Sequence, residues 1–173
     1  MTNPALSKML VALRGVFFAS AFVLLWAWLA VSVRRFDAQL EITIPAWLRP
    51  MGLVLAAAGA LVAAICIATF VTKGRGTPAP FDPPRQFVAS GPYRFVRNPM
   101  YLGASMVLLG AGLALSSPSI LLLGFAFLMI AHLFVVLYEE PGLTGRFGDS
   151  YLQYKASVGR WLVRRPKPDE EPS

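Results

Sequence analysis

The feature that most constrains this chain is a set of long intervals that contain no Asp, Glu, Lys or Arg. One interval of 19 residues covers 15–33, and a second of 22 residues covers 51–72. A third interval covers 41 residues, 98–138. A hydrocarbon core about 30 Å thick is crossed by about 20 apolar residues in a helix. The first two intervals are therefore long enough for one crossing each, and the third for two.

These intervals predict an all-α integral membrane protein with four transmembrane helices, near 13–33, 51–72, 100–116 and 119–138. The turn between the last two is expected at residues 116–119, Ser-Ser-Pro-Ser, because Ser caps helices and Pro begins them. The last two helices would then form a C-terminal helical hairpin. Only 14% of the residues are charged, against about 25% in soluble domains. We expect the first segment to be retained, because it is longer than a signal-peptide core and lacks a clear cleavage site.

The positive charges predict the orientation in the membrane. Four crossings place the N-terminus, the loop 73–97 and the C-terminal tail on one side, which holds 13 of the 16 Lys and Arg residues. That side is expected to be cytoplasmic, in a multi-pass protein of the inner membrane. The net charge of +7 fits this topology and contact with anionic lipids, and requires no nucleic acid. The single cysteine, Cys66, excludes an internal disulfide and argues against a metal site.

Composition divides the chain into three expected regions. Residues 1–72 form a two-helix scaffold, 73–166 carry the polar motifs, and 167–173 are a disordered tail rich in Pro and acidic residues. Within the second region, 143–159 is predicted to be one amphipathic, cytoplasmic interfacial helix. Its apolar and aromatic residues recur at spacings of three and four, as one helical face requires; they are Leu143, Phe147, Tyr151, Tyr154 and Val158.

Two polar clusters flank the predicted hairpin. GPYRFVRNPMYLG, residues 91–103, precedes its first helix, and LYEEP, residues 137–141, ends its second. In a hairpin these clusters meet, which brings Arg97 near Glu139. We expect either an ion pair between the arginines and glutamates or a ligand that carries both charges.

The first cluster has features suited to a small charged ligand. Asn98 and Pro99 are a typical helix start, and the free N–H groups there can bind a carboxylate or a hydroxyl. Tyr93 and Tyr101 offer aromatic faces for stacking or for cation–π contact. Gly103 removes a side chain near the same end.

His132 is the single histidine and lies two turns before Glu139 on the predicted helix. An imidazole inside a membrane helix is costly without a partner, so it should point into the bundle. We expect structural hydrogen bonding, with proton acceptance from a substrate as the alternative. Glycines 110 and 112 lack the context of a nucleotide-binding motif and are interpreted as packing residues.

Taken in order, these motifs resemble the superfamily of isoprenylcysteine carboxyl methyltransferases and phospholipid methyltransferases. The resemblance covers about residues 85–166 and rests on SGPYRFVRNPMYLG, a long apolar interval, and LYEEPGLTGRFGDSYLQYKASVGRWLVRRP. NPMY and LYEEP are similar to the end of phosphatidylethanolamine N-methyltransferase. The FG-x-x-Y-x-x-Y pattern is closer to the prenylcysteine branch.

The resemblance implies a membrane enzyme that binds S-adenosylmethionine on the cytoplasmic side and takes a lipid-like substrate from the bilayer. Region 73–166 would be its methyltransferase core. His132 and Glu140 are its candidate catalytic residues. The candidate cofactor-binding residues are Arg85, Gln86, Phe87, Val88, Tyr93, Arg97, Asn98, Pro99, Met100, Tyr101, Gly103, Glu139 and Glu140.

Two positions depart from the prenylcysteine enzymes. Asn98 stands where they usually have His, and Val135 stands where they have an Arg that binds the substrate carboxylate. We therefore expect a lipid headgroup amine or another small lipophilic acceptor rather than a prenylcysteine carboxylate. The alternatives are a small multi-pass transporter or an inactive membrane scaffold derived from the enzyme. The sequence leaves the oligomeric state open.

Overall fold

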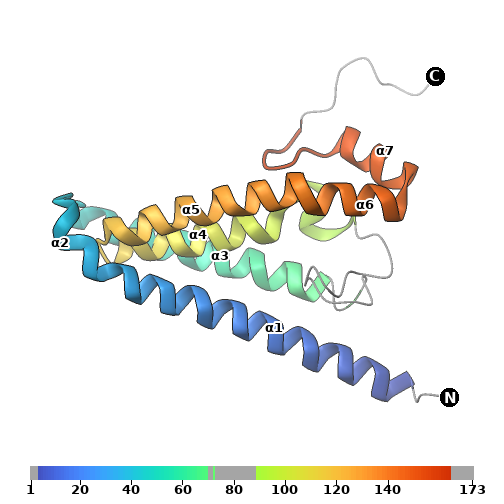
Figure 1. Cartoon of the computed structure of the whole chain (residues 1–173), viewed down its shortest axis with the longest axis horizontal. Coiled ribbons are helices and arrows are strands. Elements are labelled where there is room, and N and C mark those ends of the chain that lie inside the picture. The colour runs from blue at the N-terminus through green and yellow to red at the C-terminus, as the bar shows by residue number, and fades with distance from the viewer. Residues whose placement is uncertain (1–3, 70–71, 73–88, 165–173) are drawn as a thin grey trace.

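The computed structural model describes residues 4–69, 72 and 89–164 of the 173-residue chain. In this part the chain is helical and forms no strand. The α-helices are α1 (Pro4–Val33), α2 (Asp37–Leu40), α3 (Arg49–Thr69), α4 (Pro99–Ala114), α5 (Pro118–Phe134), α6 (Glu140–Phe147) and α7 (Asp149–Ser157). Figure 1 shows the long helices side by side, with α6 and α7 at one end of the bundle.

Three helical stretches are long and apolar enough to cross a membrane: Val16–Leu40, Ala46–Thr69 and Pro118–Phe147. The third crossing expected from the sequence corresponds to α4, a shorter apolar helix of 16 residues. At about 1.5 Å per residue, such a helix is about 24 Å long, less than the about 30 Å of a hydrocarbon core. For the described residues, the prediction of an all-helical protein with helices long and apolar enough to cross a membrane is confirmed. Four crossings and their orientation stay predictions.

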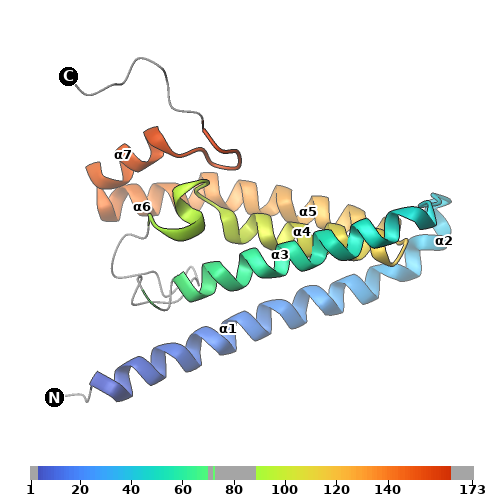
Figure 2. The ribbon, with the colours of Figure 1, turned by 180° about the vertical axis from the view of Figure 1, so that it is seen from behind.

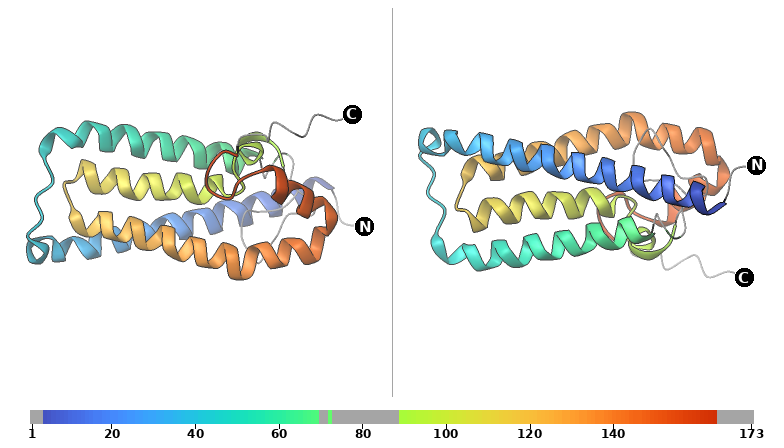
Figure 3. Two further views of the ribbon diagram at one scale, coloured as in Figure 1. Left: turned by 90° about the horizontal axis from the view of Figure 1, so that it is seen from above. Right: turned by 90° about the horizontal axis from the view of Figure 1, so that it is seen from below.

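Among the described helices, the most extensive contact joins α3 to α4, which lies between α3 and α5 (Figure 3). A methyl group added at Gly59 would lie 2.5 Å from the carbonyl oxygen of Gly103. One added at Gly110 would lie 2.5 Å from the backbone nitrogen of Ala56. Small residues let the two backbones approach this closely, as in membrane helix pairs generally. The interpretation of Gly110 and Gly112 as packing residues is confirmed, because a methyl group at Gly112 would meet Leu121 in the same way.

Helix α1 contacts the rest of the bundle mainly near its C-terminal end. The rings of Trp26 and Phe127 meet edge to face with centroids 4.7 Å apart. Just beyond α1, one carboxylate oxygen of Asp37 accepts hydrogen bonds from the Ser117 hydroxyl at 2.8 Å and the Ser119 backbone N–H at 3.0 Å. Asp37 thus fixes the expected turn before α5, where Ser117 also accepts from the N–H of Ile120. Figure 2 shows α1 diverging from α3 toward the opposite end.

Helix α5 does not end where the sequence suggests. We expected it to stop near residue 138, but a π-helical turn, Val135–Glu139, carries it directly into α6, so the helix runs to Phe147. A proline inside a regular α-helix clashes with the carbonyl group four residues earlier. The π turn makes a wider hydrogen bond, from the N–H of Glu140 to the carbonyl of Val135. This local change of register lets the helix continue through Pro141.

The prediction of a single interfacial helix at 143–159 is also wrong in detail. The segment forms two helices, α6 and α7, separated by Gly148 with a φ of +52°. That angle is left-handed, which glycine adopts without steric cost, and it ends the helix. The expected apolar face nevertheless turns inward, because Tyr151 is buried and Tyr154 is half-buried, whereas Leu152 and Gln153 are exposed.

Candidate functional site

The start of α4 and the end of α5 meet at the same end of the bundle, as the hairpin predicts. The hydroxyl of Tyr101, in the first turn of α4, donates a hydrogen bond to one carboxylate oxygen of Glu139 at 3.1 Å. Tyr101 and Glu139 are both half-buried. In the described part of the chain Glu139 has this one hydrogen-bond partner, although a carboxylate can accept about four hydrogen bonds.

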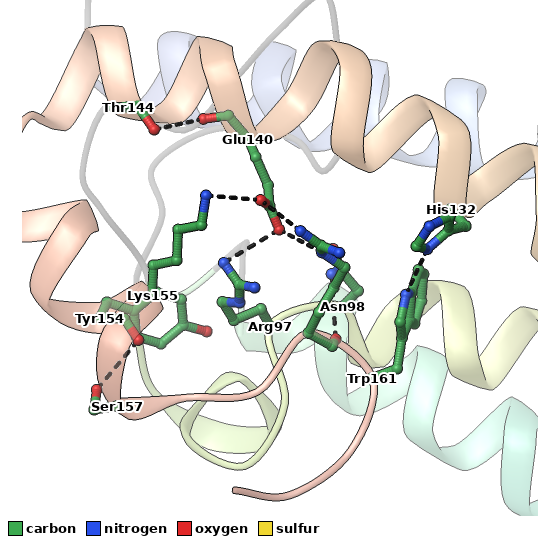
Figure 4. A network of polar contacts seen from close by, with 10 residues as sticks. Arg97, Asn98, His132, Glu140, Thr144, Tyr154, Lys155, Ser157 and Trp161 are labelled. Carbon is green, nitrogen blue, oxygen red and sulfur yellow. Dashed lines mark hydrogen bonds and ion pairs between the residues drawn. The ribbon is translucent and has the colours of Figure 1, made fainter.

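Glu140 has different surroundings from its neighbour. It is 5% exposed and lies among three cations (Figure 4). Arg160 donates from Nε at 2.7 Å and from Nη2 at 3.0 Å, one bond to each carboxylate oxygen. Nη1 of Arg97 and Nζ of Lys155 each lie 3.1 Å from the same carboxylate. We call these four residues the Glu140 cluster.

The cluster confirms that an arginine before α4 pairs with a glutamate after α5. The pair is Arg97 with Glu140, whereas Arg94 is exposed and lies over the ring of Phe95. The hydrogen bonds that Arg160 donates to Glu140 raise the pKa of Arg160, so this guanidinium stays charged. The charge of Glu140 is therefore compensated by its neighbours.

Residues Val158–Arg164, here called the strap, fold back along the segment before α4. The backbone N–H of Arg97 donates to the carbonyl of Gly159 at 2.9 Å, beside a bridge between Val96 and Gly159. The side-chain amide of Asn98 donates to the carbonyl of Arg160 at 3.3 Å. The sequence analysis did not predict this contact, although VGRWLVRRP belongs to the motif on which the family resemblance rests.

Asn98 occupies the N-cap position of α4, and Pro99 is the first helical residue, as expected. The side chain of Asn98 makes no capping hydrogen bond to the helix. Its amide is 6% exposed and faces the strap instead. The motif is therefore a helix start whose polar side chain connects two distant segments.

Three other candidates of the first cluster are largely packing residues. Tyr93 is buried against Cys66, and Met100 packs on the same pair. The backbone carbonyl of Tyr93 accepts a 2.6 Å hydrogen bond from the hydroxyl of Tyr154, which connects α7 to this turn. Burial raises the pKa of Tyr154, so its hydroxyl keeps the proton it donates. Gly103 faces α3 rather than the mouth of the hairpin.

His132 has a partner that sequence reasoning did not find. Its Nδ1 accepts a hydrogen bond from the indole N–H of Trp161, in the strap, at 3.0 Å (Figure 4). This matches the expected structural role. Arg85, Gln86, Phe87 and Val88 lie outside the described residues. Val135 is 1% exposed, within the π turn.

An open hollow of about 460 Å³ lies beside the Glu140 cluster. The strap forms most of its wall, and Arg97 and Lys155 complete the lining. Four of the lining side chains are cationic, and none of the described lining residues is acidic. The residues that line it are Arg97, Lys155, Val158, Gly159, Arg160, Trp161, Leu162, Val163 and Arg164.

Comparison with known proteins matches residues 48–150 to the model of a family described as phospholipid methyltransferase. This range includes α3, α4, α5, the Tyr101–Glu139 contact and Glu140. An uncharacterized protein of Haemophilus influenzae is 36% identical over 63 residues, which is 36% of this chain and 100% of that protein. Because the family model covers more than half of the chain, this protein belongs to the phospholipid methyltransferase family of membrane proteins.

Proposed function

We propose that this protein transfers a methyl group from S-adenosylmethionine to a lipophilic acceptor dissolved in the membrane. The observation that carries the proposal is the contact between Tyr101 and Glu139, where the start of α4 meets the end of α5. Membership of a methyltransferase family supports the reaction class. We further propose four membrane crossings, with this end of the bundle and both termini in the cytoplasm.

The residues at this contact suit the cofactor. Glu139 keeps acceptor capacity for the ribose hydroxyls or the ammonium group of the cofactor. The half-buried ring of Tyr101 can lie against a sulfonium by cation–π attraction. The unpaired N–H groups at the start of α4 add a weak positive potential for a carboxylate. We propose Tyr101 and Glu139 as the central cofactor-binding pair, with Asn98, Pro99 and Met100 holding the helix start.

The bound cofactor supplies an electrophilic methyl group on a cationic sulfur. Methyl transfer is an in-line displacement, so the principal task of the protein is to align donor and acceptor. Tyr101 can serve this task because its hydroxyl is held by Glu139 and its backbone belongs to the tightly packed α4. The half-buried setting of Tyr101 and Glu139 also limits the access of water to the reacting atoms.

An amine acceptor must lose its proton before it attacks. Among the described residues, the candidate proton acceptors are Glu139, Glu140 and His132. Glu140 is surrounded by three cations, which stabilise its charged form and occupy its oxygens. His132 already accepts a hydrogen bond from Trp161. We therefore propose Glu139 as the proton acceptor, and a positioning role for Glu140 and His132.

The acceptor we favour is a lipid headgroup amine or another small lipophilic molecule. Val135 occupies the position where the resemblance to prenylcysteine enzymes requires an arginine for the substrate carboxylate, and it is buried. A buried apolar side chain offers a carboxylate no partner. Prenylcysteine is thus the less favoured acceptor.

The test uses the full chain purified in detergent. Calorimetry should show saturable binding of S-adenosylmethionine, and incubation with labelled cofactor and a total lipid extract should yield a labelled lipid. Tyr101→Phe removes one hydrogen bond to a charged group and should weaken cofactor binding about tenfold. Glu139→Gln should weaken it at least as much and abolish product formation.

Glu41→Gln is the matched control, because Glu41 is exposed and follows α2 at the far end of the bundle. It should leave binding and product unchanged. Absence of cofactor binding in the wild-type protein at millimolar concentration would refute the proposal. So would an unaltered affinity in Glu139→Gln.

A further inference from the structure

The hollow beside the Glu140 cluster has an excess of positive charge. Arg97, Lys155 and Arg160 surround the single carboxylate of Glu140, which leaves two positive charges uncompensated among the described residues. Arg164 also lines the hollow and adds a third. The other glutamate at this end, Glu139, bonds to Tyr101 and is not among the lining residues.

Tyr151, which lies near Glu140 and Arg97, does not reduce this excess of positive charge. Burial, together with the charge of Glu140, raises the pKa of Tyr151, so its hydroxyl remains neutral near pH 7. Within the part of the chain that the structure describes, Glu140 is thus the one anion in contact with these cations.

Several N–H groups of Arg97, Arg160 and Lys155 still lack an acceptor among the described residues. The side chain of Arg97 is 9% exposed, and its Nε is buried without a hydrogen bond to any described residue. Arg160 uses Nε and Nη2 for Glu140, which leaves Nη1. The side chain of Lys155 is 41% exposed, and one contact to Glu140 does not use all three of its protons. Buried donors without acceptors are costly, so this arrangement favours binding an anion.

We propose that the hollow binds the phosphate group of a ligand, at a site separate from the Tyr101–Glu139 pair. Phosphate oxygens accept several charge-assisted hydrogen bonds at once, and arginine and lysine are the side chains that provide them. The strap adds Leu162, which is 81% exposed, and Val163, which is 65% exposed, directly beside these cations. A phosphate carried on a lipid headgroup and a free phosphate share the chemistry that this site recognises.

Phosphate binding in this hollow is independent of the proposed methyl transfer, because it needs neither the cofactor nor a methyl acceptor. Its test therefore measures binding alone. Purified full-length protein in detergent is titrated, in separate experiments, with inorganic phosphate, with dihexanoyl phosphatidic acid and with the uncharged dihexanoylglycerol. We expect saturable binding of the two phosphates and none of dihexanoylglycerol.

The relative affinities identify the source of the phosphate. Tighter binding of dihexanoyl phosphatidic acid assigns the site to a lipid headgroup, and equal binding assigns it to a soluble phosphate. Failure of both phosphates to bind overturns the proposal. Equal binding of dihexanoylglycerol also overturns it, because the hollow would then recognise the acyl chains.

Matched substitutions locate the site. Lys155→Gln leaves Glu140 with two arginines and should weaken phosphate binding about tenfold, as loss of one charge-assisted contact does. Arg164→Gln should weaken it about threefold, because this side chain is exposed and also bonds to the carbonyl of Ala156. Arg146→Gln removes the same charge from an exposed residue of α6 outside the hollow and should change nothing.

Two results would contradict this assignment. Equal weakening by Arg146→Gln and Lys155→Gln would show a general charge effect. Displacement of phosphate by saturating S-adenosylmethionine would show that the hollow receives the carboxylate of the cofactor instead. Unchanged phosphate affinity in the presence of the cofactor is the expected result, and it separates this site from the proposed methyltransferase site.

Discussion

The α3–α4 interface and the Glu140 cluster join distant parts of the chain in opposite ways. The interface uses residues with almost no side chain, so backbone meets backbone and shape decides the fit. The cluster uses long charged side chains that converge on one carboxylate from three segments. Inside a bilayer, packing must stabilise helix pairs, because lipid chains are as apolar as the side chains. At the mouth of the hairpin, charged side chains can be used because the cations and the carboxylate of Glu140 compensate one another.

The α3–α4 interface and the Glu140 cluster should therefore lose stability under different changes. The interface should tolerate changes of pH and salt but not an added methyl group. The cluster should tolerate changes of volume but not the loss of its carboxylate. Three substitutions, taken from the largest expected effect to the smallest, test this division.

Gly110→Ala should have the largest effect on stability. Its new methyl group would lie 2.5 Å from the backbone nitrogen of Ala56, and no side-chain rotation can relieve that contact. We expect a loss of about 3 kcal/mol, the upper end for overpacking. Thermal unfolding in detergent measures it.

Gly142→Ala is the matched control for this substitution. No atom lies within 4 Å of the position that its methyl group would take. Glycine to alanine at such a helical site stabilises by about 0.5 kcal/mol, through the unfolded chain. Loss of stability in both variants would show that the loss at Gly110 does not come specifically from the contact between α3 and α4.

Glu140→Gln should have an intermediate effect. It leaves three cations close together without their carboxylate, and so should release the strap. Breaking a fully buried pair costs about 3–5 kcal/mol, and the partial exposure of Lys155 and Arg160 reduces our expectation to about 2 kcal/mol. Limited proteolysis should cut the strap faster, and high salt should reduce the difference from wild type. Equal proteolysis of both proteins would contradict a tethering role.

Loss of the contact between Trp161 and His132 should have the smallest effect on stability. Trp161→Phe removes the indole N–H but keeps an aromatic ring, and should cost about 1 kcal/mol. A double-mutant cycle with His132→Gln measures the coupling between the two side chains. A coupling near zero would mean that the contact between Trp161 and His132 does not help to hold the strap.

Much of the helical framework could be predicted from the sequence, because the charge-free intervals mark the helices directly. The small-residue face of α3 was also readable, since Gly52, Ala56 and Gly59 recur at helical spacing. The meeting of the two polar clusters followed from the hairpin alone, although Glu139 bonds to Tyr101 and Arg97 pairs with Glu140 instead. These features depend on local patterns or on the nearest connection along the chain.

The strap could not be predicted in this way. Asn98 and Arg160 are 62 residues apart, and the side-chain amide of Asn98 had two plausible partners, the helix it precedes or a distant carbonyl. Propensity favours the capping role, and the tertiary contact took its place. The continuation of α5 through Pro141 was missed for a similar reason, because the usual rule treats proline as a helix breaker and the π turn removes the clash.

The π turn has a consequence for two residues that are adjacent in the chain. Each residue of an α-helix advances by about 100° around the axis, and the widened turn before Glu140 alters the direction in which everything after it points. Glu139 faces α4, and Glu140, about 100° further around the helix, faces the strap. Two adjacent carboxylates therefore have unlike surroundings: one accepts from a single tyrosine, and the other is held by three cations that close the fold.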